Sequence, residues 1–314
     1  MIIERQEDLT AAVLAELGRA GDERWREIMQ AAVVHLHAFV RDARLTEAEF
    51  QQVCAVIAQL GQHTTASHNE VVLAAGSLGV SALVCLLNNE PAAGAAGTTA
   101  NLLGPFWRAG APHRASGDCI AAPGTPGEPL FVDAQVVDRA GAPVAGAEVH
   151  VWHSSAEGFY ENQDPGQPDM NLRGIFTTDA AGFVRFRSVK PAGYPIPVGG
   201  PVGTLLRKQG RHNLRPAHVH FMVHKPGWRT QFSQVYAADD PHIDTDVQFA
   251  VTRALVADYV RHDGEAAPDG TGTAPWYSLA ARFVIEPGES RLPRPPIQGK
   301  AAGERPRPEV LARL

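Results

Sequence analysis

The sequence predicts an α+β protein in which an N-terminal helical part precedes an antiparallel β-sandwich, because the hydrophobic period changes near residue 100. Before that point, apolar residues recur every three or four positions, which is the pattern of one helix face. After residue 125, the apolar runs shorten to strand length and turn residues separate them. We therefore expect two domains, residues 1–100 and residues 101–314.

The helical pattern of the first domain is clearest between Trp25 and Val40. Two pairs of residues have capping-box spacing, Thr46 with Glu49 and Ser67 with Glu70. In a capping box the two side chains bond backbone N–H groups at the start of a helix, so each pair predicts a helix start. The run from Val71 to Leu87 is apolar nearly all round, and we expect it to be buried or shared with another subunit.

The second domain is expected to consist of short strands joined by turns. Strand-like segments are residues 130–136, 148–152, 183–186, 217–223 and 282–285. Turn signals lie between these runs, at 139–141 after the first and at 179–182 before the third. The Pro-rich segment 104–117 is predicted to be extended, and the Pro- and Arg-rich tail 287–308 to lack regular structure. This arrangement favours a sandwich of two sheets.

Composition favours a globular protein that acts on a small molecule. The chain has 314 residues, of which 44% are hydrophobic and 20% charged. A net charge of −6 gives no electrostatic footprint for nucleic acid. Three cysteines without close spacing indicate no disulfide framework, and we find no signal peptide or membrane span. We therefore expect a cytoplasmic protein without nucleic-acid or membrane partners.

Two histidines one residue apart, His218 and His220, are the first candidates for chemistry. Side chains alternate along a strand, so both imidazoles should lie on one face while Val219 and Phe221 lie on the other. Two imidazoles on one face can share a metal ion. Because a lone His-x-His pattern is common on protein surfaces, it needs support from other residues.

Two tyrosines, Tyr160 and Tyr194, supply candidates for that support, because both lie in turn-like or Pro/Gly-rich surroundings. The alternative for each tyrosine is a structural role, in which the ring packs on the core and the hydroxyl is exposed to water. A phenol has a pKa near 10, so it becomes an anionic ligand only beside a strong Lewis acid such as Fe(III). The same residue types could also hold zinc.

The segment from about 101 to 260 resembles the intradiol ring-cleaving dioxygenases, and most of all their hydroxyquinol 1,2-dioxygenase branch. The matching stretches, in order, are 103–106, 167–174, 194–197, 200–203, 210–212 and 215–221. The resemblance implies a non-haem Fe(III) bound by Tyr160, Tyr194, His218 and His220, with water or hydroxide as fifth ligand. It also implies O2 as co-substrate and a cis,cis-muconate product from a catecholic ring.

The family's catalytic roles fall on Tyr194, Arg215 and Gln234 of this sequence. The resemblance implies that Tyr194 takes a proton from the substrate and that Arg215 stabilises negative charge on the ring. The alternative for Arg215 is a surface ion pair. Gln234 is a weaker match, because glutamine is usual there in the catechol branch while the hydroxyquinol branch often has histidine.

The substrate-contact pattern of the hydroxyquinol branch is matched at Leu73, Leu103, Gly104, Pro105, Phe106, Ile196 and Pro197. Two further substrate-contact positions depart from it. Gly76 stands where the branch has an aspartate, and Gln248 where it has a small apolar residue. Loss of the carboxylate removes an acceptor for a third ring hydroxyl, and glycine is expected to leave room for a bulkier substituent.

The N-terminal helices resemble the family's dimerisation region, which implies a homodimer. The family's interface often encloses a lipid-like tunnel, so a bound lipid is a further expectation. Two alternatives from other classes remain open at this point. Segment 137–147 resembles strand-turn-strand units of non-catalytic β-sandwich binding modules, and the His-x-His pair could serve a zinc-dependent hydrolase.

Overall fold

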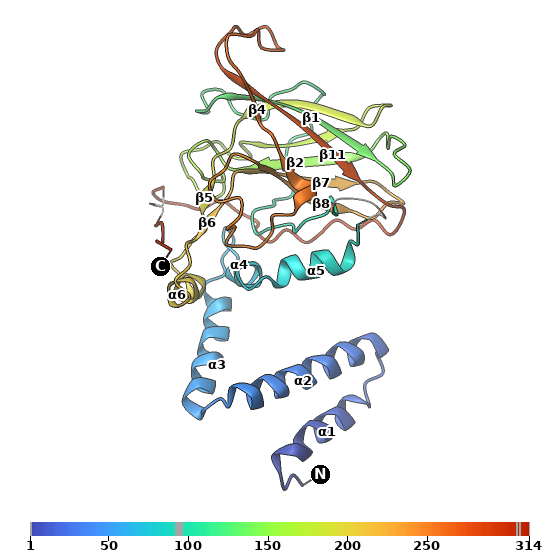
Figure 1. Cartoon of the computed structure of the whole chain (residues 1–314), viewed down its shortest axis with the longest axis vertical. Coiled ribbons are helices and arrows are strands. Elements are labelled where there is room, and N and C mark those ends of the chain that lie inside the picture. The colour runs from blue at the N-terminus through green and yellow to red at the C-terminus, as the bar shows by residue number, and fades with distance from the viewer. Residues whose placement is uncertain (1, 92–96, 306, 308, 314) are drawn as a thin grey trace. The chain divides into compact units, whose positions relative to one another are not determined.

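The computed structural model describes residues 2–91, 97–305, 307 and 309–313 of the chain (Figure 1). It divides into two compact units, Met1–Ala58 and Gln59–Leu314. The first unit contains helices α1 (Gln6–Leu17), α2 (Glu23–Ala43) and most of α3 (Glu47–Gln62). The second contains the remaining helices and all described strands.

The helix starts in the first unit follow from local hydrogen bonds. Asp22 caps α2 by accepting from the Trp25 N–H at 2.9 Å. The predicted capping box of Thr46 and Glu49 at the start of α3 is confirmed, since each side chain bonds the other's backbone N–H, at 2.9 and 3.3 Å. The α2 helix buries none of its side chains within this chain, so its apolar face is uncovered.

The apolar run 71–87 forms two helices rather than one. Helix α4 (Glu70–Ser77) ends at Leu78, and α5 (Val80–Asn88) begins after Gly79, whose φ of 75° suits glycine. The expected capping box of Ser67 and Glu70 is wrong: Asn69 caps α4 by accepting from the Val72 N–H at 2.9 Å, because it directly precedes the first helical residue.

Helices α4 and α5 differ in burial. Helix α4 buries Leu73, Gly76 and Ser77, whereas α5 buries no residue and leaves several apolar side chains exposed. In the part of the chain that is described, no single helix has the length and apolar composition of a membrane span. Helices α4 and α5 taken together meet that criterion, but they are bent by 75°.

Two stacked sheets make up the sandwich, as Figure 1 shows. The first sheet contains β10 (Val260–His262), β11 (Trp276–Val284), β1 (Pro129–Val137) and β4 (Phe183–Val189), in that order. The second contains β3 (Arg173–Thr177), β2 (Glu148–His153), β7 (His218–His224), β8 (Gln231–Ala237) and β9 (Val256–Ala257). The remaining elements are β5 (Tyr194–Pro195), β6 (Leu214–Arg215), α6 (Pro201–Lys208) and the 3-10 helix η1 (Arg253–Leu255).

The predicted α+β architecture is confirmed, with one difference in strand direction. Most strand pairs are antiparallel, but β1 pairs with β11 in parallel and β8 pairs with β9 in parallel. These pairs join strands far apart in the sequence, and the local apolar pattern carries no information about their direction. The tail beyond β11 lacks helices and strands among its described residues.

The core between the sheets comes from alternating side chains. Strand β1 buries Leu130, Val132, Ala134 and Val136. Across from it, Val219 and Phe221 of β7 lie in the same apolar core. Because side chains alternate, His218 and His220 point away from this core, as the sequence predicts. The other face of β7 meets a second apolar cluster that contains Leu73, Phe106, Trp152, Tyr160 and Tyr194.

Candidate active site

His218 and His220 lie side by side on the outward face of β7, and each is only 1% exposed. The His218 Nδ1–H donates to the Pro216 carbonyl at 2.7 Å, which leaves the lone pair on Nε2. That atom is 3.1 Å from His220 Nε2. The indole of Trp152, the cross-strand neighbour of His220, stacks on its imidazole at 4.6 Å and holds the ring in place.

Tyr160 and Tyr194 reach the same point from other segments. Tyr160 follows the turn after β2, and Tyr194 lies on β5, where it pairs with Arg215 of β6. Both tyrosines are 1% exposed, and their rings meet edge to face at 5.3 Å. The Tyr160 hydroxyl is 3.3 Å from His218 Nε2. The structure therefore brings together all four side chains that the resemblance assigns to the metal.

The protonation states of this cluster suit metal ligation. Burial, and then the charge of Arg215, lowers the pKa of His218 to about 3. Burial and the neighbouring His218 lower the pKa of His220 well below its ordinary value, so both imidazoles are neutral ligands. Burial raises the pKa of both Tyr160 and Tyr194, so neither becomes a phenolate without a strong Lewis acid.

Unsatisfied hydrogen-bonding capacity in the cluster supports the same conclusion. His218 Nε2 has one lone pair, yet His220 Nε2 and the Tyr160 hydroxyl lie 3.1 and 3.3 Å from it, so at most one of the two can donate to it. His220 Nδ1 is buried and has no hydrogen-bond partner among the described residues. Polar atoms left unpaired in a dry site are costly, and a cation bound between these side chains would satisfy them. The four side chains thus fit a single metal ion.

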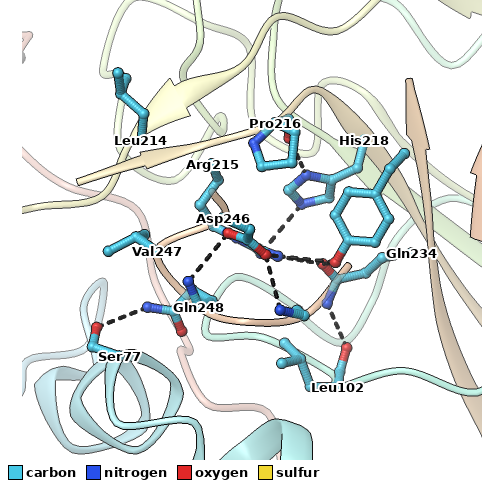
Figure 2. Close-up of polar contacts among 12 residues, drawn as sticks. Ser77, Leu102, Leu214, Arg215, Pro216, His218, Gln234, Asp246, Val247 and Gln248 are labelled. Atoms are coloured by element: carbon cyan, nitrogen blue, oxygen red, sulfur yellow. Dashed lines mark hydrogen bonds and ion pairs between the residues drawn. The ribbon is translucent and has the colours of Figure 1, made fainter. Parts of the chain in front are cut away.

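Arg215 lies beside this cluster in a buried network (Figure 2). Its Nε and Nη2 donate to the two carboxylate oxygens of Asp246, both at 3.0 Å. Nη2 also donates to Gln234 at 2.9 Å and to the Tyr236 hydroxyl at 3.0 Å. Burial alone would lower the pKa of Arg215, but Asp246, Tyr236 and Tyr194 together outweigh it and the pKa rises, so Arg215 is cationic.

The expected alternative of a surface ion pair for Arg215 is wrong, because the side chain is only 2% exposed. Its Nη1 lies 3.4 Å from His218 Nε2, next to the ligand cluster. Gln234 is also buried, and its amide bridges Arg215 and the carbonyl of Leu102, to which it donates at 2.7 Å. A fixed cation therefore stands at the edge of the cluster, where negative charge on a bound ring can be stabilised.

The predicted substrate contacts are divided among three places. Leu103, Gly104, Pro105 and Gln248 line one cavity of about 680 Å³, which is within the usual range for small-molecule sites. Ile196 and Pro197 line a smaller cavity of about 270 Å³. Leu73 and Phe106 line neither of these cavities but are buried with Tyr160 and Tyr194 in one apolar cluster.

Gly104 lies between the larger cavity and His220. Its φ is 74°, and a Cβ at this position would lie only 3.2 Å from His220 Cε1. The cavity is therefore separated from His220 by one residue without a side chain. In contrast, the expected free space over Gly76 is wrong: a Cβ there would meet Gln248 Oε1 at 1.6 Å, because the Gln248 side chain fills that space.

Several residues that hold the site together carry little or no signal in the sequence. Asp246 and Tyr236 support Arg215, and Trp152 supports His220. Asp246 follows Arg215 by 31 positions, and no local pattern links the two. A usable signal existed only for Trp152, which ends the predicted strand 148–152 shortly before the candidate ligand Tyr160.

Family models match most of the chain. The model described as "Dioxygenase" matches residues 102–279, and the model described as "Catechol dioxygenase N terminus" matches residues 22–96. The 6-chlorohydroxyquinol 1,2-dioxygenase of Cupriavidus pinatubonensis is 39% identical over 282 residues, covering 90% of this chain and 98% of the relative.

Solved structures show the same relationship. The hydroxyquinol 1,2-dioxygenase of Pseudomonas putida superposes with a TM-score of 0.78 at 34% identity, covering 90% of this chain and 99% of the other. The catechol 1,2-dioxygenase of Pseudomonas arvilla gives a TM-score of 0.76 at 30% identity, covering 98% and 99%. These matches overturn the binding-module and zinc-hydrolase alternatives. The chain belongs to the intradiol ring-cleaving dioxygenase family, and its reaction is the O2-dependent opening of an aromatic ring between two hydroxyl-bearing carbons.

Proposed function

We propose that this enzyme is a non-haem Fe(III) dioxygenase that cleaves hydroxyquinol or a substituted catechol to a cis,cis-muconate-type product. The observation that carries the proposal is the convergence of Tyr160, Tyr194, His218 and His220 in one buried cluster. The named activities of the relatives, on hydroxyquinol, 6-chlorohydroxyquinol and catechol, support the choice of substrate class.

Iron in the ferric state suits this donor set. Two phenolates neutralise much of the charge of Fe(III), and two neutral imidazoles complete the ligand shell without adding charge. When bound, the iron would supply a Lewis-acid centre for the two oxygens of a catecholic substrate. The dry surroundings of the four side chains strengthen every charge interaction within the site.

The protein's own residues have distinct proposed tasks. Tyr194 is proposed to accept a substrate proton at its phenolic oxygen, and its ring lies 5.6 Å from that of His218. Arg215 is proposed to stabilise negative charge on the substrate ring, since it is buried and cationic beside the cluster. Gln234 contributes by holding Arg215 through its amide oxygen.

We also propose the division into a helical dimerisation domain, residues 1–100, and a catalytic domain, residues 101–314. The two family models meet near this boundary, at 96 and 102, whereas the contacts within the chain separate at Ala58. The uncovered apolar faces of α2 and α5 support a homodimer through the N-terminal helices. A lipid in that interface stays a prediction. Three free cysteines support the proposed cytoplasmic location.

Metal analysis of the purified protein tests the proposal. We expect about one iron per chain, a red-brown colour from phenolate-to-iron charge transfer, and consumption of one O2 per hydroxyquinol cleaved. Tyr259→Phe, which removes a buried hydroxyl bonded to the Val235 carbonyl, serves as a matched control that should keep iron and colour. A colourless, fully active preparation that contains zinc would contradict the iron assignment.

A further inference from the structure

Gly76 and Gln248 compete for one volume at the wall of the larger cavity. Gly76 is a buried residue of α4, and Gln248 lies on the loop after β8 and is 3% exposed. A Cβ on Gly76 would lie 1.6 Å from Gln248 Oε1 and 2.6 Å from Gln248 Cδ. Both distances are far below contact distance, so a side chain at position 76 and the present position of Gln248 exclude each other.

Gln248 is held in this place by hydrogen bonds at its carboxamide nitrogen and at its backbone N–H (Figure 2). Its Nε2–H donates to the Ser77 hydroxyl at 2.9 Å. Its backbone N–H donates to the Asp246 carboxylate at 3.2 Å, and the same carboxylate binds Arg215. The side chain that fills the space over Gly76 is therefore tied to the network that fixes Arg215.

Arg211 adds a second tie between the loop and α4. Its guanidinium donates to the Ser77 carbonyl at 2.9 Å and to the Val247 carbonyl at 2.7 Å. The same guanidinium stacks over the ring of Phe249 at 4.3 Å. Residues on both sides of Gln248 are thus anchored to the end of α4, which makes Gln248 a preorganised part of the cavity wall rather than a mobile side chain.

The Gln248 carbonyl oxygen is left without a partner. Its Nε2 is used by Ser77, and no hydrogen bond to Oε1 is found among the described residues. Gln248 lines the cavity together with Leu103 and Gly104. Gly104 packs so closely against the His220 imidazole that a Cβ on it would lie 3.2 Å from His220 Cε1. None of the described residues that line this cavity is an aspartate or glutamate. A preorganised acceptor without a partner favours a ligand group that donates a hydrogen bond.

We propose that Gln248 is a specificity-determining residue: its Oε1 accepts a hydrogen bond from a ring hydroxyl other than the two that flank the cleaved bond. Gly76 is then required because it leaves room for the carboxamide. The inference rests on the proposed function, and the substrate class that it selects is a trihydroxybenzene. An acceptor for the third hydroxyl is present after all, but it comes from the loop after β8 and not from position 76.

The first test compares two substrates whose extra substituents have similar size. Hydroxyquinol carries a hydroxyl donor, whereas 4-methylcatechol carries a methyl group that cannot donate. Gln248→Met keeps the length of the side chain and removes the acceptor. We expect the ratio of kcat/KM for hydroxyquinol over 4-methylcatechol to fall about tenfold or more, as loss of one buried hydrogen bond predicts. Metal content should stay near wild type, and the rate on 4-methylcatechol should fall less than the rate on hydroxyquinol.

Binding provides a readout that does not depend on turnover. Anaerobic titration followed by tryptophan fluorescence should show that Gln248→Met weakens the binding of hydroxyquinol more than the binding of 4-methylcatechol. The matched control is Gln298→Met, at an exposed position of the tail that does not line the cavity. This control should leave unchanged both the ratio of kcat/KM values and the ratio of Kd values for the two substrates. An equal loss on both substrates would also overturn the proposal, since it would show a general packing defect.

The second test examines the competition between the two positions. Gly76→Asp alone should lower the melting temperature and the activity on both substrates, because its side chain collides with Gln248. Gly76→Asp combined with Gln248→Val should recover activity and favour hydroxyquinol, because the aspartate then supplies the acceptor. If Gly76→Asp does not fold, Gly76→Ala alone and with Gln248→Val gives the same comparison of stability. Additive effects of the two changes would overturn the coupling.

These outcomes separate the inference from the function on which it rests. A wild-type protein that cleaves no catecholic compound after iron loading contradicts the proposed function itself. A wild-type protein that is active, but whose substrate ratio is indifferent to Gln248→Met, contradicts only the role of Gln248. If the wild-type enzyme prefers a ring substituent that accepts a hydrogen bond over one that donates it, then Gln248 Oε1 is not the atom that recognises the substituent.

Discussion

Arg215 and Asp246 form a two-pronged ion pair in the interior of the protein, with Nε–Oδ1 and Nη2–Oδ2 distances of 3.0 Å. The pair joins the short strand β6 to the loop after β8, across 31 residues of sequence. Asp246 also accepts backbone N–H groups from Gln248 and Ala250, at 3.2 and 3.1 Å. One carboxylate therefore orients the buried guanidinium of Arg215 and shapes the loop that carries Gln248.

Removal of this carboxylate should destabilise the protein. Asp246→Ala leaves the Arg215 charge buried without its partner, and such a loss typically costs about 3–5 kcal/mol. Urea denaturation of the variant should show a lower free energy of unfolding, with a reduced turnover rate. Asp133→Ala, which breaks an exposed ion pair with Arg185, should change stability little. Equal free energies of unfolding for the two variants would show that the buried ion pair stabilises the protein no more than the exposed one.

Replacement of Arg215 should separate chemistry from metal binding. Arg215→Leu should keep the metal and the colour but lose turnover by about a hundredfold, as removal of one preorganised charge partner typically does. Arg215→Lys should also be impaired, because an ammonium group cannot reproduce the bonds to Asp246, Gln234 and Tyr236 together. Steady-state kinetics with metal analysis checks this. An unchanged rate with unchanged metal content would assign Arg215 a structural role only.

The two tyrosines should respond differently to removal of the hydroxyl. Tyr160→Phe should lower the metal content, because Tyr160 lies against His218 and is stacked on Phe106. Tyr194→Phe should lower turnover more than its metal content explains, since its proposed task is to accept a substrate proton. Metal analysis, visible spectra and kinetics on the same samples test the contrast. Identical ratios of activity to metal in the two variants would contradict the division of labour.

Acid should destabilise the fold through histidines that are buried in the neutral state. Burial lowers the pKa of His150 and of His153 to about 4, whereas an unfolded chain protonates histidine near pH 6.5. Between these values the unfolded chain binds more protons. The free energy of unfolding should therefore fall with decreasing pH, by about 1.4 kcal/mol per pH unit for each such histidine.

A variant isolates this contribution. His150→Gln removes one such group, so the slope of the free energy of unfolding against pH should become shallower between pH 6.5 and 4. Urea denaturation at several pH values measures both slopes. His35→Gln, at an exposed position of α2, serves as the control and should retain the wild-type slope. If the free energy of unfolding depends on pH with the same slope in the wild type and in His150→Gln, then His150 does not contribute to the acid destabilisation.

The features that the sequence by itself determined are those encoded in neighbouring residues. Alternation along a strand is a local property, so the shared face of His218 and His220 followed directly from their spacing. The capping box of Thr46 and Glu49 is local in the same sense, and it is confirmed. The Ser67 and Glu70 box failed for a local reason as well, since Asn69 stood closer to the helix and took the role of cap.

Only the tertiary structure decided what lies between segments that are distant in the sequence. The parallel pairing of β1 with β11, the ion pair of Arg215 with Asp246, and the filling of the space over Gly76 by Gln248 all join such segments. No local period distinguishes these partners from others of the same residue type. Which side chain fills a space depends on the packing of the whole domain, and this is why position 76 looked open in the sequence and is closed in the fold.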